Sequence, residues 1–79
     1  MDNLTELEEL LAKEMKSQGV SLQGILMIMD VLRDEESQET FGHFLVSIRG
    51  LEVPEWKVII VANSIAAGLM DLSEATDFL

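Results

Sequence analysis

The segment from Trp56 to Leu72 constrains the fold of this chain more than any other, because its apolar residues surround the helix axis instead of forming one stripe. Its hydrophilic strip is limited to Lys57, Ser64 and Asp71, with Gly68 beside them. A helix of this kind requires burial on nearly all sides. A chain of 79 residues offers little surface for that purpose, so the sequence predicts a helix over residues 54–71 that is buried partly against a partner.

Length and composition are those of one small globular domain, residues 1–79. Hydrophobic residues make up 48% of the chain, which argues against a disordered segment. The chain has no cysteine, which excludes a secreted fold held by disulfides. The acidic start of the sequence is unlike the basic start of an export signal, and the longest uncharged run, residues 58–70, is too short to cross a membrane. We therefore expect a cytoplasmic protein without membrane contact.

The charge of the chain argues against nucleic-acid binding. Fifteen acidic and five basic residues give a net charge of −10, whereas phosphate backbones are bound by clusters of lysine and arginine. A helix-turn-helix within residues 22–49 is an alternative that charge opposes, because its recognition segment would carry one arginine and one glutamate. We expect no direct contact with nucleic acid.

The first part of the chain encodes two amphipathic helices with recognisable ends. Asn3 and Thr5 each precede a glutamate by three residues, so either can form a capping box at the start of a helix over residues 4–18. Gly19 supplies a left-handed end, with Val20 folding back on the last turn. Ser21 then caps a second helix over residues 22–33. The apolar residues that these helices are predicted to bury are Leu4, Leu7, Leu10, Leu11, Met15, Leu22, Ile25, Leu26, Met29 and Leu32.

The acidic residues 34–36 predict a break near Glu35, followed by a third helix over residues 38–49 that Ser37 caps and Gly50 ends. An unbroken helix over residues 22–49 is the alternative. Pro54 suits the first position of the helix over residues 54–71, and Ser73 caps a short turn at residues 74–78. The sequence therefore predicts an all-α bundle of four short helices, or of five if the last turn is helical. The third helix is predicted to bury Phe41, Phe44, Leu45 and Ile48.

Residues that carry catalysis or bind metals are scarce. His43 is the only histidine and is expected to be exposed, and without cysteine it cannot build a nitrogen–sulfur metal site. The acidic run at residues 34–39 lacks the alternating ligands and the glycine of a calcium loop. The glycines are isolated, so no phosphate-binding loop is present. We expect no enzyme activity, no cofactor and no metal.

The apolar helix surfaces indicate self-association instead. The helix over residues 54–71 and the narrow polar stripe of residues 22–33 leave apolar area exposed, and such patches usually mark contact sites. A twofold interface on the last long helix would bury this area, and a Ser64–Gly68 pair would let another backbone come close. The sequence predicts a small non-catalytic interaction or regulatory domain that forms a homodimer and binds another protein. The predicted interface residues are Met27, Trp56, Ile60, Ser64, Ala67 and Gly68.

An acidic decoy is the alternative function. Such a protein inhibits a basic target, for example a nuclease or a repressor, by occupying its nucleic-acid-binding groove. Solubility alone also accounts for acidity in many small domains. The acidic surface residues that would imitate a phosphate track are Glu8, Glu9, Asp34, Glu35, Glu36 and Glu39.

Overall fold

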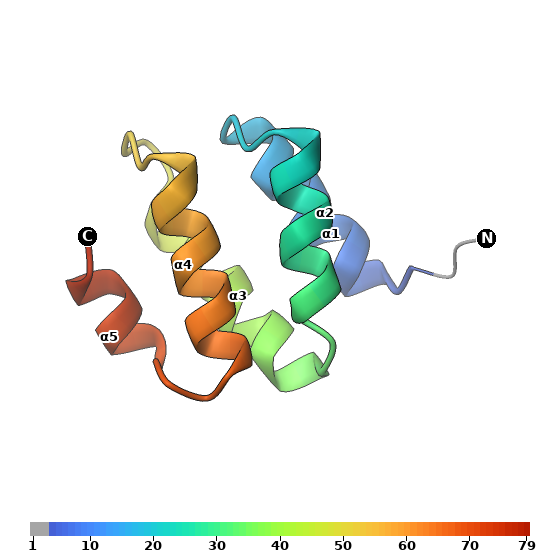
Figure 1. Cartoon of the computed structure of the whole chain (residues 1–79). Coiled ribbons are helices and arrows are strands. Elements are labelled where there is room, and N and C mark those ends of the chain that lie inside the picture. Colours follow the sequence, from blue (N-terminus) through green and yellow to red (C-terminus); the bar gives the residue numbers. More distant parts are fainter. Residues whose placement is uncertain (1–3) are drawn as a thin grey trace.

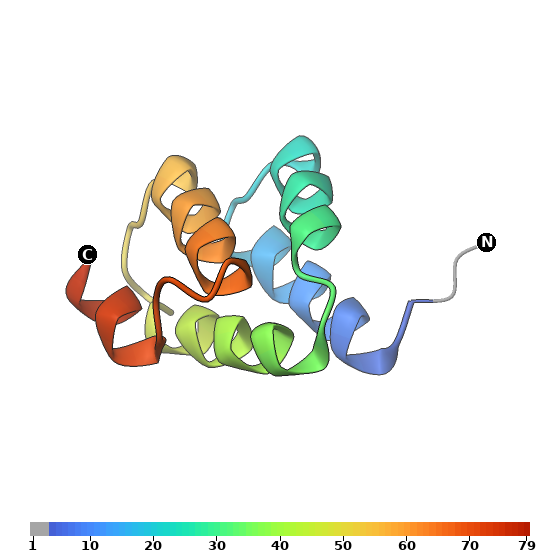
Figure 2. The same ribbon diagram turned by 60° about the horizontal axis from the view of Figure 1, so that its bottom comes forward.

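The computed structural model describes residues 4–79, and five helices make up most of this part of the chain. They are α1 (Glu6–Ser17), α2 (Leu22–Val31), α3 (Glu35–Ser47), α4 (Glu55–Ala66) and α5 (Leu72–Asp77). Figures 1 and 2 show two helical hairpins side by side, with α2 and α4 in one layer and α1 and α3 in the other. The short α5 packs against α3. The predicted all-α bundle is confirmed, and the last turn is a fifth helix.

The ends of the first hairpin are set by hydrogen bonds between near neighbours in the sequence. Thr5 caps α1: its hydroxyl accepts the Glu8 backbone N–H at 3.1 Å, and the Glu8 carboxylate accepts the Thr5 N–H at 2.9 Å. Gly19 has a φ of 91° and ends α1, and Ser21 caps α2. These three predictions are confirmed. The alternative cap, Asn3, lies outside the described residues.

The start of α3 differs from the prediction. The Asp34 carboxylate accepts the Ser37 backbone N–H at 3.0 Å, so Asp34 is the cap and α3 begins at Glu35. The predicted cap at Ser37 and the predicted start at residue 38 are therefore wrong. The unbroken helix over residues 22–49 is also wrong, because α2 ends at Val31. The physical reason is that an acidic residue accepts a cap bond as well as serine does, and further acids in the first turn suit the helix dipole.

Helix α4 is shorter than predicted. It ends at Ala66, whereas the prediction extended it to residue 71. Gly68 adopts a φ of 75°, and the Leu69 backbone N–H donates to the Ser64 carbonyl at 2.9 Å, which closes the last turn. This is the glycine-dependent helix end that also follows α1. Gly68 therefore reverses the chain instead of continuing the helix.

The reversal after α4 allows α5 to form. Asp71 caps α5, and its carboxylate accepts the Glu74 backbone N–H at 2.8 Å while the Glu74 carboxylate accepts the Asp71 N–H at 3.0 Å. The predicted cap, Ser73, lies inside the first turn. Ala75 is fully buried, which is consistent with the packing of α5 against α3.

Side chains from all five helices form the core. The largest fully buried ones are Met15, Ile28, Leu32, Phe41, Phe44, Leu45, Ile48 and Val61. All four residues predicted to be buried in the third helix are buried. The predicted burial of Leu4, Leu10, Leu22 and Leu26 is wrong, because these side chains are exposed. The apolar surface of α1 and α2 is therefore larger than the area that the neighbouring helices cover.

Gln38 is a buried polar residue in this core, at 4% exposure. Its side-chain NH₂ donates to the Leu32 carbonyl at 2.9 Å and to the Glu8 carboxylate at 3.0 Å. Gln38 therefore links α3 to the end of α2 and to α1. Every buried side-chain nitrogen and oxygen of residues 4–79 has a hydrogen-bond partner.

Candidate functional site

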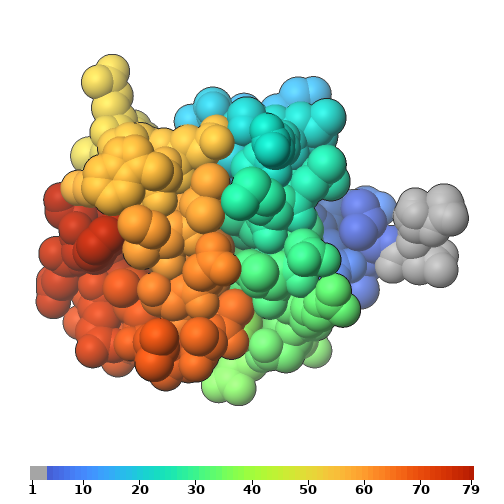
Figure 3. All heavy atoms as spheres, in the orientation of Figure 1, coloured from blue at the N-terminus to red at the C-terminus, as the bar shows by residue number. Residues whose placement is uncertain are grey.

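Two neighbouring helices expose large apolar side chains. α2 and α4 lie side by side. Glu55, at the start of α4, bonds to Ser21, the cap of α2: its carboxylate accepts the Ser21 backbone N–H at 2.7 Å and the Ser21 hydroxyl at 3.1 Å. Figure 3 shows this side of the molecule, with α2 in teal and green and α4 in orange. The exposed apolar side chains of these helices, named the α2–α4 face below, are Leu22 (73% exposed), Leu26 (61%), Met27 (49%), Trp56 (56%) and Ile60 (40%).

The α2–α4 face carries few charges. α2 contains one ionisable residue, Asp30, which pairs with Arg33 at 3.1 Å. α4 contains Glu55, which is bound to Ser21, and Lys57. The Lys57 ammonium lies 5.7 Å from the Trp56 ring centroid and 5.8 Å from that of Phe78, so it bridges α4 and α5. The acidity of the chain is therefore concentrated on other helices.

The predicted interface residues do not form one continuous helix surface. Met27, Trp56 and Ile60 are exposed on α2 and α4. Ser64 is half-buried, and Ala67 and Gly68 lie exposed in the turn that follows α4. The Ser64–Gly68 pair on one helix is wrong, because α4 ends before Gly68. Whether these residues contact a partner stays a prediction.

Two of the six acidic residues predicted for the surface stabilise helix starts. The Thr5 backbone N–H lowers the pKa of Glu8, and the Gln38 side chain adds to this effect. The Ser37 backbone N–H lowers the pKa of Asp34. Both carboxylates are favoured in their ionised form because each accepts hydrogen bonds from helix N–H groups or amides.

A groove between α1 and α3 is a second apolar surface. It has a volume of about 540 Å³, and its apolar lining residues, which define the α1–α3 groove below, are Leu7, Leu10, Leu11, Gly42, Leu45 and Val46. Leu10 and Val46 are more than half exposed, and His43 is exposed beside them, as predicted for that histidine. The sequence did not predict this groove, because Leu10 was expected in the core. The spacing of Leu7, Leu10 and Leu11 is that of one apolar helix face, so it gave no signal that Leu10 would stay exposed.

An ion pair crosses one end of this groove. The Arg49 guanidinium donates to the two carboxylate oxygens of Glu14 at 2.9 and 2.7 Å, and the Gln18 side chain donates to the same carboxylate at 2.6 Å. The bonds from Arg49, and then the bond from Gln18, lower the pKa of Glu14 from 4.5 to about 2. Gln18 also donates to the Leu45 carbonyl at 2.8 Å, so this cluster joins the ends of α1 and α3.

Glu14→Gln is expected to weaken the dependence of stability on acid pH. A carboxylate with a lowered folded-state pKa stabilises the fold above its unfolded pKa, and the stabilisation is lost as the pH falls from about 5 toward 2. Because Arg49 is 60% exposed, solvent screening reduces the effect, and we expect wild type to lose about 1 kcal/mol more than the variant. Urea unfolding at pH 5 and pH 3 measures this difference. Glu9→Gln, at an exposed glutamate of α1, is the control, and equal losses in all three proteins would contradict the assignment.

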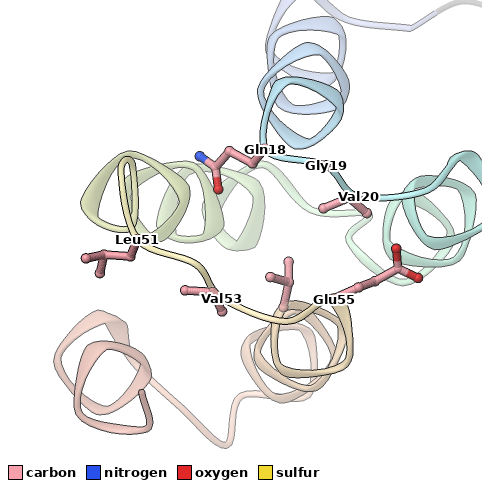
Figure 4. A pocket seen from close by; sticks show the side chains of 7 residues that line it. Gln18, Gly19, Val20, Leu51, Val53 and Glu55 are labelled. Atoms are coloured by element: carbon pink, nitrogen blue, oxygen red, sulfur yellow. The ribbon is translucent and has the colours of Figure 1, made fainter.

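One pocket near the start of α4 is too small for a ligand. Figure 4 shows a pocket between the α1–α2 turn and the segment that leads into α4, bordered by Gln18, Val20, Val53 and Glu55. Its volume is about 20 Å³, which accommodates about one water molecule. The apolar surfaces of the helices are therefore better candidates for function than this pocket.

No protein-family model, curated protein or solved structure matches this chain. Within residues 4–79, no helix has both the length and the apolar content needed to cross a bilayer. No group of three or more histidine, cysteine or acidic side chains in that range is arranged to hold a metal ion.

Proposed function

We propose that this chain is a non-catalytic protein-interaction domain that forms a homodimer through the α2–α4 face. The observation that carries the proposal is the exposure of five large apolar side chains on two adjacent helices. Large apolar side chains left exposed on neighbouring helices often mark a site of contact. The residues at the centre of the proposed interface are Met27, Trp56 and Ile60.

Charge favours a second copy of the chain as the partner for this face. The chain carries a net charge of −10, so two copies repel one another on most approaches. The α2–α4 face is the exception, because Asp30, Glu55 and Lys57 each already have a partner within the same chain. A typical stable interface buries roughly 800 Å² per partner, about one-sixth of the 5085 Å² surface of this chain. Two helices that lie side by side can supply such an area through a twofold contact.

Ile60→Lys is expected to convert the dimer to a monomer. The variant places an ammonium group in the apolar interface, and we expect the dissociation constant of the dimer to rise at least about tenfold. The added positive charge reduces the net repulsion between copies, so weaker pairing could not be attributed to long-range charge. Sedimentation equilibrium or light scattering after gel filtration measures the association.

Val46→Lys is the matched control for the dimer. Val46 is an exposed aliphatic residue on α3, in the opposite layer, and the substitution changes the net charge by the same amount. We expect this variant to dimerise like wild type. A wild-type chain that stays monomeric up to about 500 µM would contradict the proposal, because its dissociation constant would then lie in the millimolar range.

The acidic decoy has less support. Of its six predicted residues, Glu8 and Asp34 accept hydrogen bonds within the chain. Glu36 borders a depression beside the end of α4, whereas Glu39 lines the α1–α3 groove. Glu36 therefore faces other surroundings than Glu39, whereas imitation of a phosphate backbone needs all six carboxylates in one continuous track.

A further inference from the structure

The α1–α3 groove is lined by α1 and α3. Figure 2 shows these two helices in the layer opposite α2 and α4. α1 and α3 run parallel: Glu8 bonds to Gln38 near their starts, and Glu14 pairs with Arg49 near their ends. Gly42 allows the two helices to approach, since a Cβ atom there would lie 3.3 Å from the Leu11 side chain. The α1–α3 groove therefore has an apolar floor between two parallel helices. The groove and the depression that continues it are together called the trough below.

A second depression extends the trough toward the starts of α1 and α3. Leu7 borders both depressions, and Glu6 and Glu35 line the extension, while Glu39 lines the groove itself. The carboxylates of these three glutamates make no hydrogen bond or ion pair with any side chain of residues 4–79. Two arginines also border the trough, but Arg49 is bound to Glu14 and Arg33 to Asp30. The trough therefore combines exposed apolar side chains with three carboxylates that lack a cation within the described residues.

We propose that the α1–α3 groove binds an amphipathic helix of another protein that carries lysine or arginine beside its apolar face. Apolar anchors spaced three or four residues apart would contact Leu10 and Val46, and the flanking cations would reach Glu6, Glu35 and Glu39. α1 and α3 are 12 and 13 residues long, which corresponds to roughly 18–20 Å and to about three turns of a bound helix.

Charge complementarity selects this occupant over a second copy of the chain. A second copy would bring a net charge of −10 to a trough whose three carboxylates have no cation partner among residues 4–79. A basic helix would bring cations to these carboxylates. Like the proposed function, this inference makes the chain an interaction domain. It concerns a different partner and a different surface, so each of the two can fail without the other.

The experiment uses two synthetic peptides of about 16 residues, long enough to span the trough as a helix. One has leucines at i, i+4 and i+7 with flanking lysines, and the other has glutamate in place of each lysine. Fluorescence anisotropy gives the affinities of both peptides for the full chain, and amide NMR shifts locate the contact. We expect the basic peptide to bind, with the largest shifts around Leu10, Gly42 and Val46, and with affinity that falls as salt is added. We expect no binding of the acidic peptide.

Two variants with equal charge change separate specific docking from general attraction to an acidic protein. Val46→Lys is expected to weaken binding of the basic peptide at least about tenfold, while Ile60→Lys leaves the affinity within about twofold of wild type. Glu39→Gln changes a carboxylate that has no side-chain partner among residues 4–79, and it should reduce the salt dependence of peptide binding. The proposal is overturned if the basic peptide does not bind, if both lysine variants lose affinity equally, or if the shifts fall on the α2–α4 face. Dimerisation of the same samples, measured separately, reports on the proposed function.

Discussion

Replacement of Phe44 by alanine is expected to lower the free energy of unfolding by about 3–5 kcal/mol. Phe44 is fully buried, and its ring lies 6.0 Å from that of Phe41, centroid to centroid. α3 carries both rings and packs against α1, α4 and α5, so the cavity would open where most of the bundle meets. A chain of 79 residues is stabilised by about 4–12 kcal/mol in total. The variant would therefore lose a large part of its stability.

Urea unfolding followed by helical circular dichroism measures this effect. Wild type and variant are compared at one protein concentration, because self-association would add a concentration-dependent contribution. Leu51→Ala is the control: Leu51 lies outside the helices and is 59% exposed, so its truncation should change the stability by less than about 0.5 kcal/mol. A loss below about 1 kcal/mol for Phe44→Ala would show that this side chain is not central to the core.

The second large effect is expected for Gln38→Ala, at about 1–3 kcal/mol. The Leu32 carbonyl lies at the end of α2 and accepts the Gln38 amide in a buried setting. Removal of the amide leaves this carbonyl without a partner, and a buried unpaired polar group costs more than the net energy of the bond. The same substitution removes the bond to Glu8, and with it a link between α1 and α3.

Thermal and urea unfolding of three variants test this prediction. Gln38→Leu keeps most of the side-chain volume and still leaves the Leu32 carbonyl unpaired, so it should lose stability as well. Gln23→Ala, at an exposed glutamine of α2, should behave like wild type. Full stability of Gln38→Leu would mean that side-chain volume, and not the hydrogen bond, is what this position requires.

Helix ends were the most predictable part of the fold where one local pattern had no competitor. Gly19 and Ser21 act through bonds to residues within five positions in the sequence, and so does Thr5, which was one of two caps predicted for α1. Asp34 and Ser37 are two possible caps three residues apart, and the prediction of Ser37 was wrong. Because α3 starts at Glu35, Gln38 reaches both Leu32 and Glu8. These bonds join three helices, so no pattern of neighbouring residues in the sequence predicts them.

Gly68 shows how one residue supported two interpretations. A glycine inside an apolar segment is compatible with close packing of helices and with a left-handed helix end. The structure has the helix end, and α5 then packs against α3 with Ala75 buried. This packing stabilises the reversal, and it depends on residues far from Gly68 in the sequence.

The candidate surfaces were predictable only in part. Met27 was predicted because it lies on the polar stripe of its helix, and Trp56 and Ile60 because they lie on the helix with few polar positions; all three are exposed. Leu10 and Val46, which border the α1–α3 groove, were missed. An exposed leucine and a buried leucine have the same effect on a periodic pattern, so the pattern alone does not separate them.

The sequence by itself determined that this chain is all-helical, strongly acidic and rich in apolar helix surface, because caps, helix periodicity and charge depend on residues close together in the chain. The tertiary structure alone decided which apolar residues remain exposed. Ile25 and Leu26 are neighbours with similar side chains, yet α2 buries the first and exposes the second. The reason is that burial depends on which helices come together and at what angle, and contacts between distant segments set that geometry.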